Sequence, residues 1–207
     1  MRWLGRTDYR ATWDAMRAFT DARTDETPDE IWLVEHSPVY TMGLRGRDGD
    51  VHDIDGIPLI YTDRGGDITY HGPGQAVLYV LVDLRRLGIG IKTLVRALEQ
   101  AIIDYLGQYG VIADRRSGAP GVYVENKKIA SLGLRVRHSC SYHGLALNVA
   151  MDLAPFSRIN PCGYEGLEVT QTTDLGIPTT WTDAGDGLVQ RLTQLLGYNA
   201  VKKQSDL

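Results

Sequence analysis

The sequence predicts one α+β domain that spans residues 1–207 and is built around a mixed sheet. Three observations lead to this prediction. The 207 residues are 43% hydrophobic, which provides enough apolar side chains for one sizeable core. Short apolar runs typical of paired strands outnumber the stretches with helical spacing. Their order is mixed rather than a strict alternation of strand and helix, which favours α+β over a wound parallel sheet.

The expected elements follow from the spacing of apolar residues. Helices are expected where apolar residues recur every three or four positions, at 12–23, 91–106 and 182–196, with Thr182 as the N-cap of the last. Strands are expected at 31–34, 57–61, 68–70, 76–84, 121–125, 129–137 and 142–149. The run 76–84 is almost wholly apolar and is expected at the centre of the sheet. Residues 43–56 are expected to form a long surface loop, and the polar tail 201–207 is expected to be frayed.

Composition argues against several classes of partner and compartment. Lys and Arg number 22 against 26 Asp and Glu, and a net charge of −4 provides no general attraction for nucleic acid. Two cysteines, Cys140 and Cys162, cannot build a disulfide framework, which favours a reducing compartment. The N-terminal residues contain no apolar stretch of the signal-peptide kind, and no run of about 18 apolar residues predicts a membrane span. We therefore expect a cytoplasmic protein with no nucleic-acid or membrane partner.

Strand alternation places one lysine among apolar residues. On a regular strand from residue 127, Lys127 faces water and Lys128 shares a face with Ala130, Leu132, Leu134 and Val136. A four-residue loop at 138–141 would pair Leu132 with Leu147, so that the apolar faces of two neighbouring strands coincide. Burial penalises the charged form of an amine, which gives Lys128 the property of a base near neutral pH. The alternative is a lysine at a strand end that extends to solvent.

Cys162 is the candidate nucleophile. Pro161 and Gly163 frame it in a turn that can present a thiol outward. The thiolate is the attacking form, so a neighbouring cation or base must favour loss of the proton. The alternative is a small residue in an ordinary surface turn. Cys140 lies in the predicted polar hairpin loop and is interpreted as incidental.

The segment from Arg64 to Gln75 is rich in glycine, which lets backbone N–H groups approach a ligand closely. Its spacing matches neither a Walker motif nor GxGxxG, so it gives no support for ATP binding. The alternative is a tight hairpin between two strands. His71, His143 and Cys162 lack the spacing of a metal site, and no metal is expected. On the predicted register His143 lies eight residues from Lys128, on the inward face with Leu145 and Leu147, and it can equally be a core histidine.

Five motifs occur along the chain in an order that is typical of one enzyme family: EHSPVYTMG at 35–43, RGGDITYHGPGQ at 64–75, KIASLG at 128–133, YHGLALN at 142–148 and NPCG at 160–163. From about Trp32 to Thr170 the chain therefore resembles the lipoyl(octanoyl) transferases, the octanoyl-[acyl-carrier-protein]:protein N-octanoyltransferases of lipoate biosynthesis. The glycine-rich motif is the most specific of the five. The resemblance implies the fold of the biotin and lipoate protein ligases.

The resemblance also implies roles for particular residues. Cys162 would carry an acyl-thioester intermediate, and Lys128 would activate its thiol and act as acid and base. The residues implied to border the acyl substrate are Arg64, Gly65, Gly66, Asp67, Ile68, Thr69, Tyr70, His71, Ser131, Leu132, Gly133, His143, Gly144, Leu145 and Ala146. An eight-carbon chain needs an apolar slot, and Leu132, Leu145 and Leu147 are candidates for its walls.

The implied partners are octanoyl-acyl carrier protein as donor, and as acceptors the lipoyl domains of 2-oxoacid dehydrogenases and the glycine cleavage H protein. No cofactor is implied, because the substrate carries its own phosphopantetheine. Arg45, Arg47, Arg135 and Arg137 would suit an acidic carrier, although they can equally be solvated surface charges. Two alternatives are an ATP-dependent lipoate or biotin protein ligase and a non-catalytic binder of lipoyl domains.

Overall fold

The computed structural model describes residues 1–46, 52–159 and 167–205. The strands of the large sheet are β1 (Arg2–Thr7), β2 (Glu30–His36), β7 (Gln75–Leu81), β8 (Asp114–Arg116), β9 (Ala119–Val124), β10 (Lys127–Arg137), β11 (Cys140–Asn148) and β12 (Gln204–Ser205). Those of the small sheet are β3 (Val39–Met42), β4 (Asp53–Ile54), β5 (Ile57–Tyr61) and β6 (Thr69–His71). The helices are α1 (Tyr9–Asp21), α2 (Leu84–Leu87), α3 (Ile91–Gly107) and α4 (Trp181–Leu195), with the short 3-10 helices η1 (Ala154–Arg158) and η3 (Thr173–Leu175).

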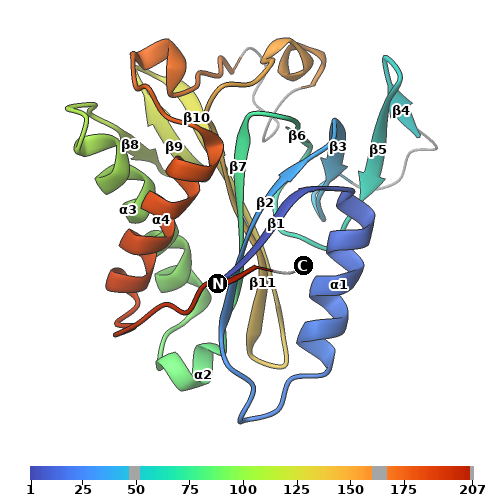
Figure 1. Cartoon of the computed structure of the whole chain (residues 1–207). Coiled ribbons are helices and arrows are strands. Elements are labelled where there is room, and N and C mark those ends of the chain that lie inside the picture. The colour runs from blue at the N-terminus through green and yellow to red at the C-terminus, as the bar shows by residue number, and fades with distance from the viewer. Residues whose placement is uncertain (47–51, 160–166, 206–207) are drawn as a thin grey trace.

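The large mixed sheet separates two layers of helices (Figure 1). Its strand order is β12-β1-β2-β7-β11-β10-β9-β8, and the small sheet has the order β4-β5-β3-β6. Helices α3 and α4 cover one face and bury the main hydrophobic cluster, whereas α1 covers the other face and packs on a second cluster around Trp32, Val77 and Tyr79. Strand β7 is buried along its whole length between β2 and β11, as its apolar run predicts.

Capping residues fix where two helices begin. Helix α1 begins at Tyr9, three residues earlier than expected, because the Asp8 side chain accepts a hydrogen bond of 2.9 Å from the Ala11 amide. At α4 the predicted cap is wrong: Thr180 rather than Thr182 caps the helix and accepts from the Asp183 amide at 3.1 Å. The polar caps lie just outside the apolar stripes from which the helices are predicted.

The β10–β11 hairpin is tighter than predicted. Arg137 pairs with Cys140, so the turn holds only His138 and Ser139, and Leu132 lies opposite Leu145 instead of Leu147. Both turn residues have positive φ, at 50° and 62°, as a two-residue hairpin turn requires. The sequence lacks the Asn-Gly signal typical of such turns, and this explains the wrong loop length. A slip of two residues does not by itself move a side chain to the other face of the sheet.

The chain ends form an unpredicted sheet edge. Strand β1 pairs in parallel with both β2 and β12, and the Met1 amino group donates to the Lys202 carbonyl at 2.7 Å. The expectation of a frayed tail is therefore wrong for Gln204–Ser205. The expected loop at 43–56 includes the short strand β4, paired antiparallel with β5, while 47–51 lie outside the described residues.

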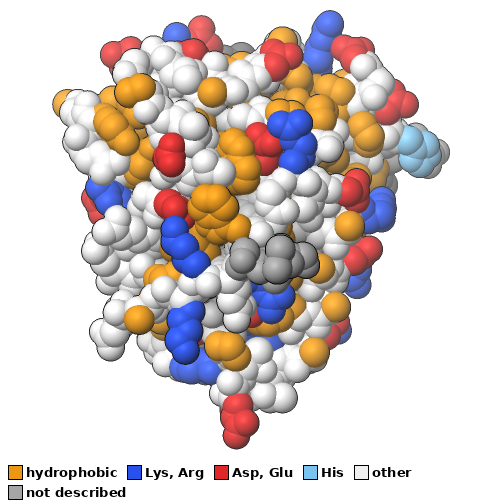
Figure 2. Space-filling model, in the orientation of Figure 1, with side chains coloured by type: hydrophobic (Ala, Val, Ile, Leu, Met, Phe, Trp, Pro, Cys, Tyr) orange, Lys and Arg blue, Asp and Glu red, His pale blue; other side chains and the backbone are white. Residues whose placement is uncertain are grey.

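Within the residues that the structure describes, no helix is both long and apolar enough to cross a bilayer. Acidic and basic side chains are interspersed over the face shown in Figure 2, in agreement with a net charge of only −4.

Candidate functional site

A slot lies on the face of the large sheet that α1 covers. Its empty space, mouth included, is about 500 Å³. All the predicted substrate-bordering residues line it except Gly65, which lines a neighbouring recess, and Tyr70, which packs in the core of the small sheet. Lys128 lines the slot as well. Of the three leucines expected as walls, Leu132 and Leu145 line the slot, whereas Leu147 is fully buried in the main core.

The floor of the slot consists of small side chains arranged in rows across the strands. One row runs in register through Ser131, Ala146 and Val77, which line the slot, and continues on β9 at Gly121, next to the Lys128 side chain. The next row contains Gly133 and Gly144, where a side chain would not fit. A Cβ on Gly133 would lie 2.8 Å from the Gly65 carbonyl oxygen, and one on Gly144 would lie 1.9 Å from the Leu78 carbonyl oxygen. These glycines keep the floor low and let the 64–66 loop approach β10.

Lys128 is buried, with 2% of its surface exposed, while the Lys127 side chain is 48% exposed. The contrast agrees with the prediction, but the strand is not regular. The β9–β10 register shifts between Lys128 and Ala130, and both Ile129 and Ala130 belong to the main core. The expectation that Lys128 shares a face with Ala130 is therefore wrong. The bulge directs Lys128 into the slot, on the other side of the sheet.

The Lys128 side chain crosses β9 at a position that has no side chain. A Cβ on Gly121 would lie 2.6 Å from Lys128 Cε and 3.2 Å from Nζ. The Nζ lies 5.6 Å from the centre of the Tyr123 ring. Gly121 is itself held by its amide, which donates to Glu99 Oε1 at 3.2 Å. The amine thus has a defined path across the end of the floor row.

Cys162 lies outside the described residues, but the chain on either side of segment 160–166 is placed. Ile159 and Leu167 line one surface recess together with Lys127. Directly after the segment, the Lys128 amide donates to the Glu168 carbonyl at 2.8 Å, and the Thr170 amide donates to the Lys128 carbonyl at 3.0 Å. The described residues that flank this segment therefore lie near the start of β10.

Aromatic rings close the end of the slot at β7. Tyr9, His71 and Tyr79 line this end, and the Tyr9 and His71 rings stack with centroids 5.7 Å apart. Behind them His36 Nε2 shares a hydrogen bond of 2.6 Å with the Tyr79 hydroxyl. Burial lowers the pKa of His36 to about 4 and that of His71 to about 3, and it raises the pKa of Tyr9 to about 12. We call Tyr9, His36, His71 and Tyr79 the end wall; it is uncharged at neutral pH.

His143 faces the opposite side of the sheet from the one predicted. Its φ of +62° turns the ring toward Tyr79 and Tyr142, away from the core that holds Leu145 and Leu147. It lies opposite Leu134, six residues from Lys128 along β10 rather than eight. The turned ring lines the slot and is also buried and hydrogen-bonded to Asp63, so its position fits both interpretations of His143.

The His143 ring is held by the carboxylate of Asp63. That carboxylate is 3.0 Å from His143 Nε2 and accepts from Trp13 Nε1 at 3.0 Å and from the Tyr142 hydroxyl. Burial favours a higher pKa for Asp63, but these hydrogen bonds outweigh it and hold the pKa below its usual range. A charged carboxylate beside Nε2 fixes the ring orientation, while burial lowers the pKa of His143.

Arg64 holds the glycine-rich loop in place. Its guanidinium is buried and donates to the carbonyl oxygens of Thr41 at 2.6 Å, Asp67 at 2.7 Å and Gly65 at 3.0 Å. The loop also bonds to the sheet, since the Gly65 amide donates to the Leu134 carbonyl at 2.9 Å. The alternative of a tight hairpin between two strands is wrong, because β5 and β6 each pair with β3 and not with each other.

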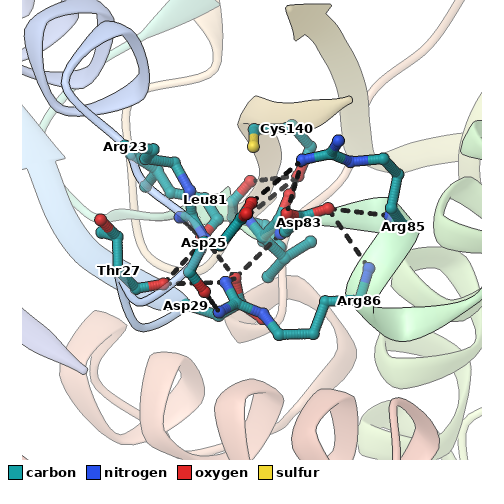
Figure 3. Close-up of polar contacts among 12 residues, drawn as sticks. Arg23, Asp25, Thr27, Asp29, Leu81, Asp83, Arg85, Arg86 and Cys140 are labelled. Carbon is teal, nitrogen blue, oxygen red and sulfur yellow. Dashed lines mark hydrogen bonds and ion pairs between the residues drawn. The ribbon is translucent and has the colours of Figure 1, made fainter. Parts of the chain in front are cut away.

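Cys140 lies in a different part of the molecule. It is the first residue of β11 and only 4% exposed, so its assignment to a polar loop is wrong. Figure 3 shows it beside a cluster of ion pairs in which Asp29 contacts Arg23 at 2.5 Å and Arg86 at 2.9 Å. Burial raises the pKa of the Cys140 thiol, which favours the unreactive protonated form. Cys140 is not among the residues that line the slot.

Three residues that line the slot are not predicted from the sequence: Tyr9, Val77 and Tyr79. Tyr9 precedes the expected start of its helix, and the signal that could have found it is the Asp8 cap. Val77 and Tyr79 belong to a strand that is apolar on both faces, so alternation does not distinguish their face.

Residues 8–193 match the family model described as the lipoyl protein ligase A/B catalytic domain. The chain belongs to this family. Among its relatives, the octanoyltransferase of Dechloromonas aromatica (strain RCB) is 59% identical over 193 residues, which cover 93% of this chain and 94% of the relative. The octanoyltransferase of Alkalilimnicola ehrlichii is 60% identical over 181 residues, covering 87% and 84%. The resemblance seen in the motifs is confirmed, and this family member is an acyltransferase.

Solved structures confirm the predicted ligase-like α+β fold. The crystal structure of lipoate-protein ligase A bound with ATP superposes with a TM-score of 0.81 at 17% identity, covering 100% of this chain and 89% of that one. Biotin protein ligase from Aquifex aeolicus, in complex with biotin and ATP, gives 0.61 at 11% identity, covering 94% and 69%. At these identities the likeness concerns the fold alone.

Proposed function

We propose that this acyltransferase moves an octanoyl group from acyl carrier protein to a specific lysine of lipoyl domains, as a cytoplasmic step of lipoate biosynthesis. Cys162 carries the acyl group as a thioester, and Lys128 is the acid and base. The acceptors are the lipoyl domains of 2-oxoacid dehydrogenases and the glycine cleavage H protein. The observation that carries the proposal is a buried amine that lines one end of a slot, on a residue whose backbone bonds to Glu168 and Thr170, just after the segment that contains Cys162.

The first half-reaction exchanges one thioester for another. Lys128, in its neutral form, accepts the proton of the Cys162 thiol, and the thiolate attacks the carbonyl carbon of the octanoyl thioester. The tetrahedral intermediate collapses with loss of the phosphopantetheine sulfur, which takes the proton back from Lys128. One C–S bond forms and one breaks, so this step needs no external energy source.

The second half-reaction forms the amide. The neutral amine of the acceptor lysine attacks the octanoyl carbonyl, and Lys128 removes a proton from the attacking nitrogen. Lys128 then gives this proton to the sulfur of Cys162, which leaves as the thiol as the C–S bond breaks. An amide is more stable than a thioester, so transfer is downhill without ATP. The slot contributes binding energy: at ~0.8 kcal/mol for each buried CH₂, an eight-carbon chain provides roughly 6 kcal/mol before ordering costs.

The fold shared with ATP-binding ligases makes a second activity worth testing. A ligase would activate free octanoate with ATP and would not need Cys162. We would therefore incubate the protein with octanoyl-acyl carrier protein in one reaction and with free octanoate and ATP in another. Intact mass spectrometry would follow octanoyl groups on the enzyme and on a lipoyl domain. Capture only from the carrier-protein thioester is the expected result.

Matched cysteine variants identify the nucleophile. Cys162→Ala should abolish both acyl capture and transfer, whereas Cys140→Ala should retain both because Cys140 lies outside the slot. Lys128→Met removes the amine but keeps an unbranched buried side chain, and it should slow acyl capture. Transfer by the Cys162→Ala protein would refute the thioester intermediate. Capture by the Lys128→Met protein at the wild-type rate would refute the role of Lys128.

A further inference from the structure

We propose that Val77 sets the length of acyl chain that the slot accepts, by ending the slot opposite Lys128. This inference rests on the proposed octanoyl transfer and deepens it. Val77 lines the slot from the central strand β7 and is 2% exposed. No hydrogen bond depends on its side chain, so its size can be changed without removing a polar contact.

The floor row gives the slot a measurable length. Gly121, Ser131, Ala146 and Val77 lie in register on the four consecutive strands β9, β10, β11 and β7. The first three side chains of the row are small, a hydrogen, a hydroxymethyl and a methyl group, and the isopropyl group of Val77 is the largest. Neighbouring strands lie ~4.8 Å apart, so three steps place Val77 roughly 14 Å from Gly121. A chain that lies along this row crosses the strands and meets its first branched side chain at Val77.

The reactive end of the row is at Gly121, because the Lys128 amine crosses β9 there. An octanoyl chain with ~1.5 Å C–C bonds spans roughly 9 Å when extended. About 5 Å of the row then remain for the sulfur that carries the chain and for its hydrogen bond with Lys128. An eight-carbon chain therefore places its terminal methyl group against Val77.

The slot cannot lengthen beyond Val77 without breaking packed structure. The next residue in the row is Val34 of β2, which is fully buried and clustered with Met16 of α1. The end wall closes the same end, with Tyr79 held by its hydrogen bond to His36. Closely packed side chains do not yield to extra methylene groups without strain. A shorter acyl chain leaves the Val77 end empty and loses roughly fourfold in affinity for each missing methylene.

A neighbouring apolar recess offers the acyl chain a different path. It shares Leu132 and Gly133 with the slot, and Val95 of α3 forms part of its wall. The glycine-rich loop lies across that path, because the Gly65 carbonyl would be only 2.8 Å from a Cβ on Gly133. The Gly65 amide also bonds to the Leu134 carbonyl. This contact favours the row that leads to Val77.

The test uses carrier-protein thioesters from hexanoyl to dodecanoyl and measures single-turnover acyl capture by intact mass. Val77→Ala should raise the decanoyl-to-octanoyl capture ratio at least tenfold, because the smaller side chain leaves room for a longer chain at the end of the row. Val77→Phe should fill the end of the slot and lower octanoyl capture at least tenfold relative to hexanoyl. Val95→Phe, in the recess, is the matched control and should keep the wild-type length profile.

Each outcome decides between the two paths. A Val77→Ala protein with the wild-type decanoyl-to-octanoyl capture ratio would overturn the inference. If the Val77→Phe protein does not fold, the Val77→Ala result alone is sufficient. A Val95→Phe protein that rejects octanoyl would overturn it as well, by placing the chain in the recess. If the wild-type protein captured no acyl group of any length, the proposed function would fall, and this inference with it.

Discussion

Substituting Gly121 by alanine tests the placement of the Lys128 amine without changing the amine itself. The new Cβ would lie 2.6 Å from Lys128 Cε and 2.7 Å from the Ala130 carbonyl oxygen. Carbon atoms in contact lie ~3.5–4.0 Å apart, so Cε must move by about 1 Å. Alanine must also adopt the φ of +144° that glycine has at this position.

Two effects of Gly121→Ala can be measured separately. A displacement of about 1 Å in a positioned reacting group costs up to ~100-fold in rate, which we expect for single-turnover acyl capture. Backbone strain lowers the free energy of unfolding by roughly 1–3 kcal/mol, which urea titration measures. A pH–rate profile adds a third readout, since a displaced base changes the pH dependence of capture while simple destabilisation does not.

Gly118→Ala is the control for strain alone. Gly118 also has a positive φ, +78°, but nothing lies within 4 Å of its Cβ position. This variant should lose a comparable amount of stability and keep the wild-type rate of capture. The reasoning is refuted if Gly121→Ala captures octanoyl as fast as Gly118→Ala does, because the path of Lys128 over Gly121 would then have no bearing on the chemistry.

Three further predictions concern pH, stability and association. The pKa of buried His36, about 4, lies below its unfolded value of ~6.5, so the unfolded state binds more protons between these values. The contribution of His36 to the free energy of unfolding is therefore fully present above pH 6.5, and about 2–3 kcal/mol of it should be lost by pH 4.5. Urea titration of the His36→Gln variant should show a smaller loss of stability over the same pH range. Asp29→Asn should lower the free energy of unfolding by about 3–5 kcal/mol, because it leaves the buried Arg23 without its anion. Asp25→Asn, which changes a side chain that is 97% exposed, should change this free energy by no more than about 0.5 kcal/mol. Arg135→Glu, at an exposed position on β10, should weaken the binding of an acidic carrier protein several-fold in low salt and much less in high salt. An unchanged Kd would show that Arg135 is a solvated surface charge with no part in binding the carrier protein.

Elements with a strong apolar period are predictable from this sequence, and the sheet edge is not. The stripe of leucines and isoleucines predicts α3 to within a residue, and the apolar run in β7 predicts its central position. Strand β1 has neither signal, because RWLGRT mixes charged and apolar residues without a period. It is a strand because the chain end, β12, and β2 pair with it from both sides. Such long-range pairing leaves no local pattern.

The site is predictable where residues cluster in motifs and not where one backbone angle decides. The glycine-rich segment and the two strand motifs do meet at the slot. The face of His143 depends instead on a φ of +62°, which parity cannot anticipate. The hairpin register likewise depends on two positive φ angles at His138 and Ser139. Both features place a non-glycine residue in a conformation that sequence patterns disfavour.

Lys128 illustrates how a correct burial prediction can rest on an incomplete structural reason. Parity identifies it as the buried lysine of a pair, yet Ala130, with which the argument groups it, belongs to the main core on the opposite face of the sheet. The bulge after Lys128 reverses the alternation, and it directs the side chain across β9. That path is open only because the residue below it, Gly121, has no side chain. The burial of this lysine therefore depends on two sequence features, the lysine itself and a glycine on the neighbouring strand, which only the folded sheet brings together.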